Sequence, residues 1–218
     1  MNSVIILAGG NGSRFKSSIP KQFSNLKDKQ TVLSFVINQF TKNQYVDEVI
    51  IVVSKPWLKK IQNEFKNFKV IVGGGNRSQS SFNGLKACSS KCINVLIHDA
   101  ARPLVSQEII NNSINELSNY DAVIPTLDVP DSLIFNKDGK NKYLDRQIIK
   151  LVQTPQSFKY NKIFSAYNSN TNELDDYSVL LKNKDIDVKS KFIKGSKFNF
   201  KITTKNDIKF ARKLVYEL

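Results

Sequence analysis

The chain is poor in the residues that metal sites and membrane proteins need. Among 218 residues there are two cysteines, Cys88 and Cys92, and one histidine, His98. These three cannot supply four zinc ligands without carboxylates, so we interpret the cysteines as reduced thiols on a helix. The apolar runs 48–53 and 93–97 are far too short to span a bilayer, and no basic segment followed by a long apolar one begins the chain. We expect a cytoplasmic protein without a membrane partner.

Basic residues are numerous but form no run of five or more. Lysine and arginine total 33 against 19 acidic residues, which gives a net charge of +14. Such a chain attracts polyanions. However, the lysines are spread along the whole sequence, and aromatic residues do not alternate with arginines as a platform for single-stranded nucleic acid requires. We expect a solvated basic surface that attracts small phosphorylated molecules, and no nucleic-acid partner.

Apolar segments of strand character alternate with segments of helical periodicity. The strand-like segments are 4–8, 48–54, 68–74, 93–99 and 120–127, and the expected helices are 31–43, 78–90 and 106–119. Ser78 and Ser106 can cap the last two helices. Such alternation is typical of a parallel sheet with helices on both faces. We predict a single α/β domain over 1–218 with a Rossmann-like, mostly parallel sheet.

Residues 128–153 have a different character. Two β-prone pieces, 132–135 and 147–153, flank a polar turn at 138–139, which predicts a protruding hairpin arm. An arm that leaves a compact domain exposes apolar side chains, and pairing of two copies is the simplest way to cover them. We therefore expect a homodimer through this dimerisation arm. Arg146 on the arm suits bidentate contact with a phosphate, an ordinary surface arginine being the alternative.

The last part of the chain contains two predicted helix starts. Asp175 and Asp176 come just before a helical stretch, where capping of exposed N–H groups is their expected role. Residues 197–203 are expected to form a last strand that carries Lys201 and Thr203. A final helix then begins near 206–207.

The first strand runs directly into a glycine-rich loop. Gly9, Gly10 and Gly12 have no Cβ, so the backbone can adopt positive φ and bring N–H groups against phosphate oxygens. Arg14 and Lys21 add positive charge. The loop has neither the spacing of a P-loop nor the third glycine of a dinucleotide fingerprint. The arrangement indicates binding of a nucleotide triphosphate, with an ordinary strand-to-helix turn as the alternative.

Two further motifs follow strands and should meet this loop at one edge of the sheet. The glycines of 73–78 allow close approach of a base or ribose to which Ser80 can donate, or they form a plain turn before a capped helix. Asp99 can hold Mg²⁺ or a substrate hydroxyl, or cap the next turn. Arg102 is expected to form an internal ion pair. The predicted nucleotide contacts are Ala8, Gly9, Gly10, Gly12, Gly74, Gly75 and Ser80.

The chain resembles the cytidylyltransferases of the non-mevalonate isoprenoid pathway, which join CTP to 2-C-methyl-D-erythritol 4-phosphate. The resemblance covers nearly the whole chain and depends on the segments LAGGNGSR, IPKQF, HDAARP, LDR, TPQSF and FKIT, in this order and spacing. It implies that Arg14 and Lys21 stabilise the charge that develops on the α-phosphate. It also implies that Arg146 and Lys201 position the acceptor, and that Ser132 replaces a threonine of the arm.

The same resemblance implies a homodimer in which Arg146 serves the neighbouring subunit's site. The expected substrate contacts are Asp99, Ser132, Thr154 and Thr203. Because CTP and the acceptor are both polyanions, we expect Mg²⁺ or another divalent cation, bound mainly through the triphosphate and with Asp99 as a ligand.

Several alternative functions remain open at this point. The segments LAGG and FKITT are also similar to those of ribitol-5-phosphate cytidylyltransferases, so another polyol phosphate is the main alternative acceptor. A sugar-1-phosphate nucleotidyltransferase, a nucleotide sensor without catalysis and an RNA-binding module are less consistent with the combined motifs.

Overall fold

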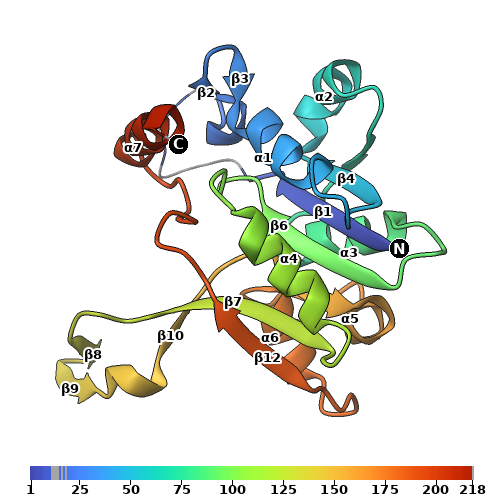
Figure 1. Cartoon of the computed structure of the whole chain (residues 1–218). Helices are drawn as coiled ribbons and strands as arrows, with labels where there is room; N and C mark the ends of the chain where they lie inside the picture. Colours follow the sequence, from blue (N-terminus) through green and yellow to red (C-terminus); the bar gives the residue numbers. More distant parts are fainter. Residues whose placement is uncertain (11–14, 16, 18, 218) are drawn as a thin grey trace.

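A computed structural model describes residues 1–10, 15, 17 and 19–217, and the structural statements below concern that part of the chain. Its centre is an eight-stranded sheet (Figure 1). The strand order is β10-β7-β11-β6-β1-β4-β5, and β12 also pairs with β7. The strands are β1 Asn2–Ala8, β4 Glu48–Val53, β5 Lys69–Val72, β6 Asn94–Asp99, β7 Ala122–Asp128, β10 Lys150–Val152, β11 Gln156–Lys159 and β12 Ser190–Lys194.

Most neighbouring strands in this sheet are parallel. β1 pairs in parallel with β4 and β6, β4 with β5, and β12 with β7. Only β10 and β11 run antiparallel to their neighbours. The five strand-like segments expected between residues 4 and 127 all form strands of this sheet, so the predicted mostly parallel α/β fold is confirmed. Because β1, β4 and β6 are parallel, their carboxyl ends meet at one edge.

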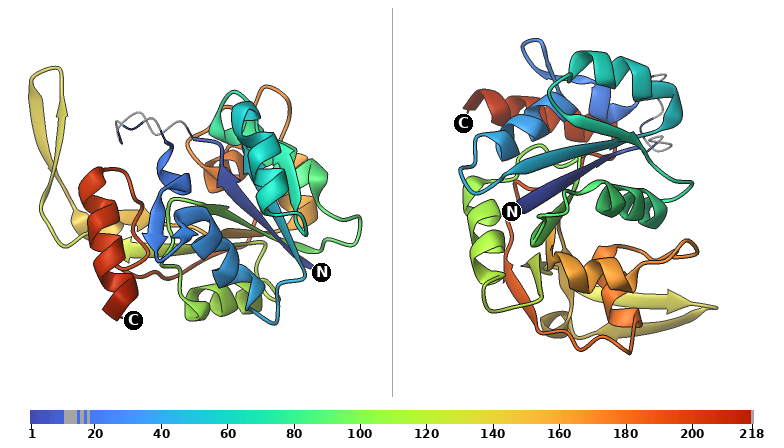
Figure 2. Two further views of the ribbon diagram at one scale, coloured as in Figure 1. Left: turned by 90° about the horizontal axis from the view of Figure 1, so that it is seen from above. Right: turned by 90° about the vertical axis from the view of Figure 1, so that its right-hand side faces the viewer.

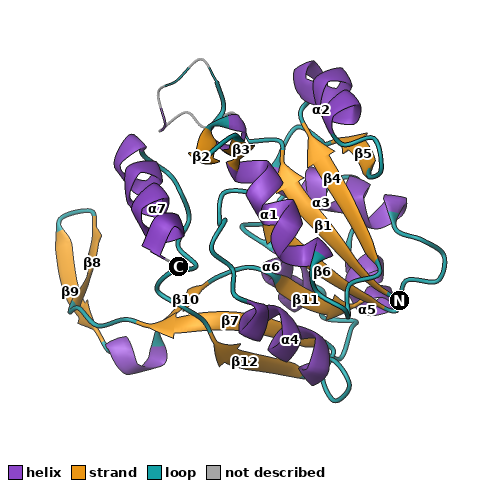
Figure 3. Cartoon of the chain, turned by 45° about the horizontal axis from the view of Figure 1, so that its top comes forward, coloured by secondary structure: helices purple, strands orange, loops and turns teal. Residues whose placement is uncertain are grey.

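Helices cover both faces of the sheet (Figure 3). The helices α1 Val32–Thr41, α2 Leu58–Glu64 and α4 Gln107–Glu116 pack on one face, and α3 Arg77–Ala87, α5 Tyr160–Ala166 and α6 Asp176–Lys182 pack on the other. Side chains alternate along β1 accordingly: Val4 and Ile6 belong to the first apolar cluster, and Ile5 belongs to the second. A strand buried on both faces explains the continuous apolar runs in the sequence.

Of the two predicted serine caps, one is confirmed and the other is wrong. Ser106 does cap α4, because its side chain accepts a hydrogen bond from the N–H of Ile109. Ser78 does not cap α3. The helix starts one residue earlier, and Asn76 accepts from the N–H of Gln79, while Ser78 is buried inside the first turn. Asparagine caps as well as serine does, so propensity alone could not decide between them.

The hairpin arm is present but its second strand differs from the prediction. Strands β8 Leu133–Lys137 and β9 Lys140–Leu144 pair with each other and project from the sheet (Figure 2). Asp138 and Gly139 both have positive φ, 50° and 73°, as a two-residue hairpin turn requires. A two-residue turn of this kind pairs the residues directly before it with those directly after it. The expected partner, 147–153, instead forms a 3₁₀ turn, Arg146–Ile148, and the strand β10 of the main sheet.

The expected last strand is absent. Residues 197–203 are described and contain no strand; the backbone N–H of Ile202 donates to Ala101 O at 2.8 Å, just beyond β6. The expected final helix is confirmed as α7 Lys205–Glu217, which packs near the small pair β2 Asn25–Lys27 and β3 Gln30–Thr31. Two further 3₁₀ turns are Lys21–Phe23 and Lys55–Trp57. No helix in the described part is long and apolar enough to cross a bilayer.

Candidate active site

A cavity of about 370 Å³ opens where β1 and β6 end. Its lining comes from segments far apart in the sequence: 7–10, 21–22, 74–77, 99–101 and the positions 80, 201 and 203. Of the predicted nucleotide contacts, six lie here, namely Ala8, Gly9, Gly10, Gly74, Gly75 and Ser80. The seventh, Gly12, lies outside the described residues. The three motifs therefore meet at one edge of the sheet, as their positions after strands predicted.

The glycine loop after β1 is held by a buried side chain that the sequence analysis did not single out. Gln22 Nε2 donates to the carbonyl oxygens of Ala8 at 2.7 Å and Gly10 at 3.0 Å. The expected positive φ is not found at Gly9 or Gly10. A Cβ at Gly10 would meet no atom within 4 Å, so this glycine borders open space. The PKQF segment thus contributes a glutamine that shapes the loop.

Two lysines from opposite ends of the chain line the cavity. Lys21 donates to the carbonyl oxygen of Ile202. Lys201, the residue before Ile202, places its ammonium 2.7 Å from Asp99 Oδ2. Arg14, the other predicted cation of the glycine loop, lies outside the described residues. The structure therefore brings together two of the four predicted catalytic cations, even though residues 197–203 form no strand.

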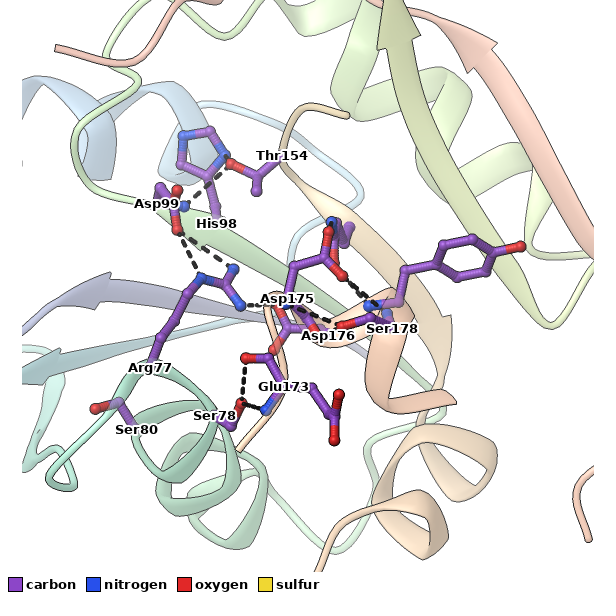
Figure 4. A network of polar contacts seen from close by, with 12 residues as sticks. Arg77, Ser78, Ser80, His98, Asp99, Thr154, Glu173, Asp175, Asp176 and Ser178 are labelled. Carbon is purple, nitrogen blue, oxygen red and sulfur yellow. Dashed lines mark hydrogen bonds and ion pairs between the residues drawn. The ribbon is translucent and has the colours of Figure 1, made fainter. Parts of the chain in front are cut away.

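Asp99 is the acidic residue of the cavity lining, and Figure 4 shows its contacts with Arg77. Its Oδ1 atom lies 3.3 Å from both Nε and Nη2 of Arg77, and its Oδ2 accepts from Lys201. Burial by itself would raise the pKa of Asp99, but the positive charges of Arg77 and Lys201 outweigh it and hold that pKa well below its usual range. Asp99 is therefore an ionised carboxylate in the cavity lining.

Thr154 bonds the backbone of Asp99 and is not part of the cavity lining. The Asp99 N–H donates to Thr154 Oγ1 at 3.1 Å, and that hydroxyl lies 3.1 Å from His98 Nδ1. His98 Nε2 lies 3.0 Å from the carbonyl oxygen of Arg102, which can only accept. The hydrogen of His98 is thus on Nε2, and Thr154 donates to Nδ1. Burial lowers the pKa of His98 to about 4, so the ring is neutral near pH 7.

Arg102 has an internal role, but its partner is not the carboxylate that was expected. Its Nη1 donates to the carbonyl oxygen of Asn199 at 2.8 Å, and the Asn199 amide in turn donates to Thr154 O at 2.8 Å. Burial lowers the pKa of Arg102. No ion pair of Arg102 within 4 Å is found among the described residues, so the expected ion pair is not seen there. Arg102 fastens the segment before Lys201 to the loop after β6.

Arg77 is the principal site residue that the sequence analysis missed. It is the first residue of α3, and its Nη1 lies 2.7 Å from Asp176 Oδ2 (Figure 4). Burial opposes its charge, but Asp176 and Asp99 together raise its pKa above the usual value. The available signal was an arginine two residues after the glycines of 73–75, at the same sheet edge as Asp99.

The two adjacent acids at the start of α6 have different roles. Asp175 caps the helix, as predicted, by accepting from the N–H of Ser178 at 2.8 Å. Asp176 does not act as a cap. It is fully buried and accepts from the Tyr167 hydroxyl at 2.7 Å in addition to its pairing with Arg77. A buried carboxylate needs such partners, which only tertiary structure supplies.

Two predicted hydroxyl contacts line the cavity but are engaged with the protein. Ser80 Oγ accepts from the Gly74 N–H and donates to Asn76 O at 2.9 Å, so its hydrogen is directed into the loop. Thr203 Oγ1 donates to Asp207 Oδ2 at 2.8 Å. Both residues border the space that a ligand would fill.

The arm residues lie away from this cavity. Neither Ser132 nor Arg146 lines it. Arg146 donates to the carbonyl oxygen of Pro130 and lines a separate hollow at the base of the arm, which also includes Asp128 and Lys150. Within one chain, the predicted acceptor-positioning pair of Arg146 and Lys201 is therefore divided between two places.

A mostly parallel sheet with a glycine loop after its first strand, and lysines around a cavity at that edge, is the arrangement expected of a nucleotidyltransferase. Residues 2–217 match the model of the family described as IspD: 2-C-methyl-D-erythritol 4-phosphate cytidylyltransferase. The chain belongs to this family, and the predicted resemblance and cytidylyltransferase class are confirmed.

Curated relatives agree with this assignment. The 2-C-methyl-D-erythritol 4-phosphate cytidylyltransferase of Clostridium botulinum (strain 657 / Type Ba4) is 35% identical over 230 residues, covering 100% of this chain and 98% of that protein. The Clostridioides difficile (strain 630) protein of the same name is 36% identical, with 99% and 94% covered. The bifunctional enzyme IspD/IspF of Pelagibacter ubique (strain HTCC1062) is 39% identical, and 96% of this chain spans 57% of its length.

Solved structures show the same fold. The 4-diphosphocytidyl-2C-methyl-D-erythritol synthase of Anaerococcus prevotii DSM 20548 has a TM-score of 0.85 at 29% identity, with 99% of this chain and 96% of that chain covered. The bifunctional IspDF of Campylobacter jejuni has a TM-score of 0.84 at 28% identity, with 95% and 53% covered. In both bifunctional proteins, this chain corresponds to about half of the whole.

Proposed function

We propose that the cavity at the ends of β1 and β6 holds CTP next to 2-C-methyl-D-erythritol 4-phosphate and transfers CMP to the latter's phosphate. The observation that supports this site is the convergence of the glycine loop, Lys21, Asp99 and Lys201 on one space. At Gly74, Gly75 and the loop after β1, the lack of a Cβ lets backbone N–H groups come close to a nucleotide. The proposed location of the reaction is the cytoplasm.

The chemistry is an in-line displacement. A phosphate oxygen of the acceptor forms a bond to the α-phosphorus of CTP, and the bond from that phosphorus to the bridging oxygen breaks, releasing pyrophosphate. The nucleophile is already anionic at neutral pH, so no general base is needed. His98, neutral and bonded on both ring nitrogens, fits this view.

The protein's task is to bring two polyanions together. Alignment of reactants can account for about 7–11 kcal/mol of the barrier, provided that their charges are compensated. Lys21 and Lys201 supply part of this compensation from the cavity wall, and Arg14 is proposed to add to it. Each ammonium now bonded to a protein oxygen can exchange that partner for a phosphate oxygen.

The residues of the cavity fit a divalent cation held mainly by substrate. No group of three or more His, Cys, Asp or Glu side chains suited to a metal occurs in the described part of the chain, and Asp99 is the acidic residue of the cavity lining. Mg²⁺ commonly binds through one or two carboxylates together with substrate phosphates. Asp99 and the triphosphate would hold Mg²⁺, which when bound neutralises phosphate charge.

The arm supports the proposal of a homodimer. Its apolar side chains are unusually exposed, with Tyr143 at 72% and Ile148 at 78%. Exposed apolar surface of this kind is typical of an interface. We propose that a second copy covers it, and that Ser132 and Arg146 then serve the partner's cavity instead of their own.

The direct test is pyrophosphate release from CTP with two acceptors side by side, 2-C-methyl-D-erythritol 4-phosphate and ribitol 5-phosphate. We expect turnover with the first and little with the second. Lys21→Ala should lower kcat by about 10²–10³, as loss of one transition-state donor does. Lys59→Ala, on the exposed side of α2, is the matched control. Preference for ribitol 5-phosphate would refute the acceptor, and full activity of Lys21→Ala would refute the site.

A further inference from the structure

Arg77 bridges two carboxylates that belong to different elements of the fold. Nη1 pairs with Asp176 at the start of α6, and Nε and Nη2 pair with Asp99 at the end of β6 (Figure 4). Asp176 is in turn fixed by the buried Tyr167 hydroxyl. The guanidinium is therefore held at both of its ends.

Asp99 has two cationic partners with different properties. Arg77 touches Oδ1 from a planar group that Asp176 anchors, with 25% of its side chain exposed. Lys201 touches Oδ2 through one ammonium on a flexible stem, and its side chain is 38% exposed. A lysine of this kind can leave a carboxylate for a phosphate, whereas a doubly paired arginine cannot leave without stranding Asp176.

Given the roles proposed above for Asp99 and Lys201, we propose that Arg77 is a positioning residue for cytidylyl transfer. It keeps the Asp99 carboxylate fixed and charged while Lys201 exchanges Oδ2 for a substrate phosphate. Arg77 acts through Asp99, and Asp176 serves as its anchor. Without Arg77, that exchange would leave the Asp99 carboxylate with no ion-pair partner from the described part of the chain, which is costly for a buried charge.

The test is a double-mutant cycle in kcat/KM between Arg77→Gln and Asp99→Asn. Loss of a residue that supports a ligand carboxylate typically costs about 10–100-fold, so Arg77→Gln alone should fall in this range. In the Asp99→Asn background, the same substitution should cost less than about threefold. Arg77→Lys should recover part of the activity, because an ammonium keeps the charge but cannot bridge both carboxylates.

Matched variants separate this role from a structural one. Lys86→Gln, exposed near the end of the same helix, should behave as wild type. Thermal unfolding of each variant measures the contribution of the Arg77–Asp176 ion pair to stability. Loss of this pair lowers stability whether residue 99 is aspartate or asparagine. If Arg77→Gln does not fold, Arg77→Lys replaces it in the cycle.

Two results would overturn the positioning role. The first concerns Arg77 alone, and the second also overturns the proposed function of Asp99. If Asp99→Asn is impaired and the two losses multiply, Arg77 acts independently of Asp99. If Asp99→Asn has wild-type activity, the proposed function of Asp99 fails and the role of Arg77 fails with it. If Lys21→Ala is impaired in the second case, the cavity remains the site of the reaction.

Discussion

The side-chain amide of Gln22 lies 2.7 Å from the carbonyl oxygen of Ala8, the last residue of β1. The same nitrogen donates to Gly10 O at 3.0 Å, so one buried amide fixes both sides of the bend at Gly9. Neighbouring Lys21 extends to Ile202 O instead. The 3₁₀ turn Lys21–Phe23 thus places the Gln22 side chain against the glycine loop, while Lys21 lines the cavity and bonds to Ile202.

Gln22→Ala should weaken both stability and nucleotide binding. The buried carbonyl oxygen of Ala8 would lose its donor, which costs about 1–3 kcal/mol, and the loop would lose its support. We expect the free energy of unfolding to fall by about this amount and the KM for CTP to rise. Urea unfolding and steady-state kinetics measure the two effects. Gln44→Ala, an exposed glutamine, is the control. A destabilised variant with an unchanged KM for CTP would separate Gln22 from the site.

Gly10→Ala and Gly84→Ala should have opposite effects. A Cβ at Gly10 would meet none of the described residues within 4 Å, so we expect unfolding unchanged within about 0.5 kcal/mol but a higher KM for CTP. A Cβ at Gly84 would lie 2.5 Å from Ile5 Cγ2, where α3 packs against β1. Overpacking of this kind costs about 1–3 kcal/mol. Thermal unfolding and CTP kinetics on both variants check the contrast; equal KM values would contradict it.

The sequence predicted those parts of the site that follow strands directly. The glycine loop and Asp99 were placed correctly because a strand's carboxyl end is recognisable from a local apolar run and its last residue. The pairing of Arg77 with Asp176 could not be predicted in this way. It depends on α3 and α6 packing on the same face of the sheet, which no local pattern records.

Two errors have a common physical cause, which is that local propensity yielded to tertiary contacts. Segment 147–153 is apolar and β-branched, whereas 140–144 is polar, yet the turn at 138–139 decides which one pairs. Residues 197–203 look like a strand, but their backbone is held by the loop after β6. Lys201 reaches the cavity by this contact and not by a place in the sheet.

Asp207→Asn should show a stability loss that depends on pH. Burial would raise the pKa of Asp207, but the hydrogen bonds from Thr203 and Thr204 together outweigh it and lower the pKa. Since the folded pKa is depressed, the stabilisation is present above the unfolded pKa of about 3.8 and disappears as pH falls through the folded value. We expect the wild type to be more stable at pH 7 and the difference to shrink below pH ~4. Urea unfolding from pH 7 to pH 3 measures it; a difference independent of pH would exclude the charge as its source.

Arg146→Ala should raise the KM for the acceptor and leave the binding of CTP largely unchanged. Arg146 lies on the arm, outside the cavity of its own chain, and a guanidinium suits a phosphate. Calorimetry with each ligand measures the two affinities. Lys142→Ala, an exposed arm residue, is the control. Equal weakening of both ligands would contradict an acceptor-specific role.

Mixing the Lys21→Ala and Arg146→Ala proteins tests whether the arm serves the partner. If each site combines Lys21 of one chain with Arg146 of the other, one of the two sites in a mixed dimer carries both residues. Random pairing of equal amounts then restores about a quarter of wild-type activity, because half of the dimers are mixed. If each site takes both residues from one chain, every site in the mixture lacks one of them. An absence of recovery, with subunit exchange verified by mass spectrometry, would therefore place Arg146 in its own chain's site.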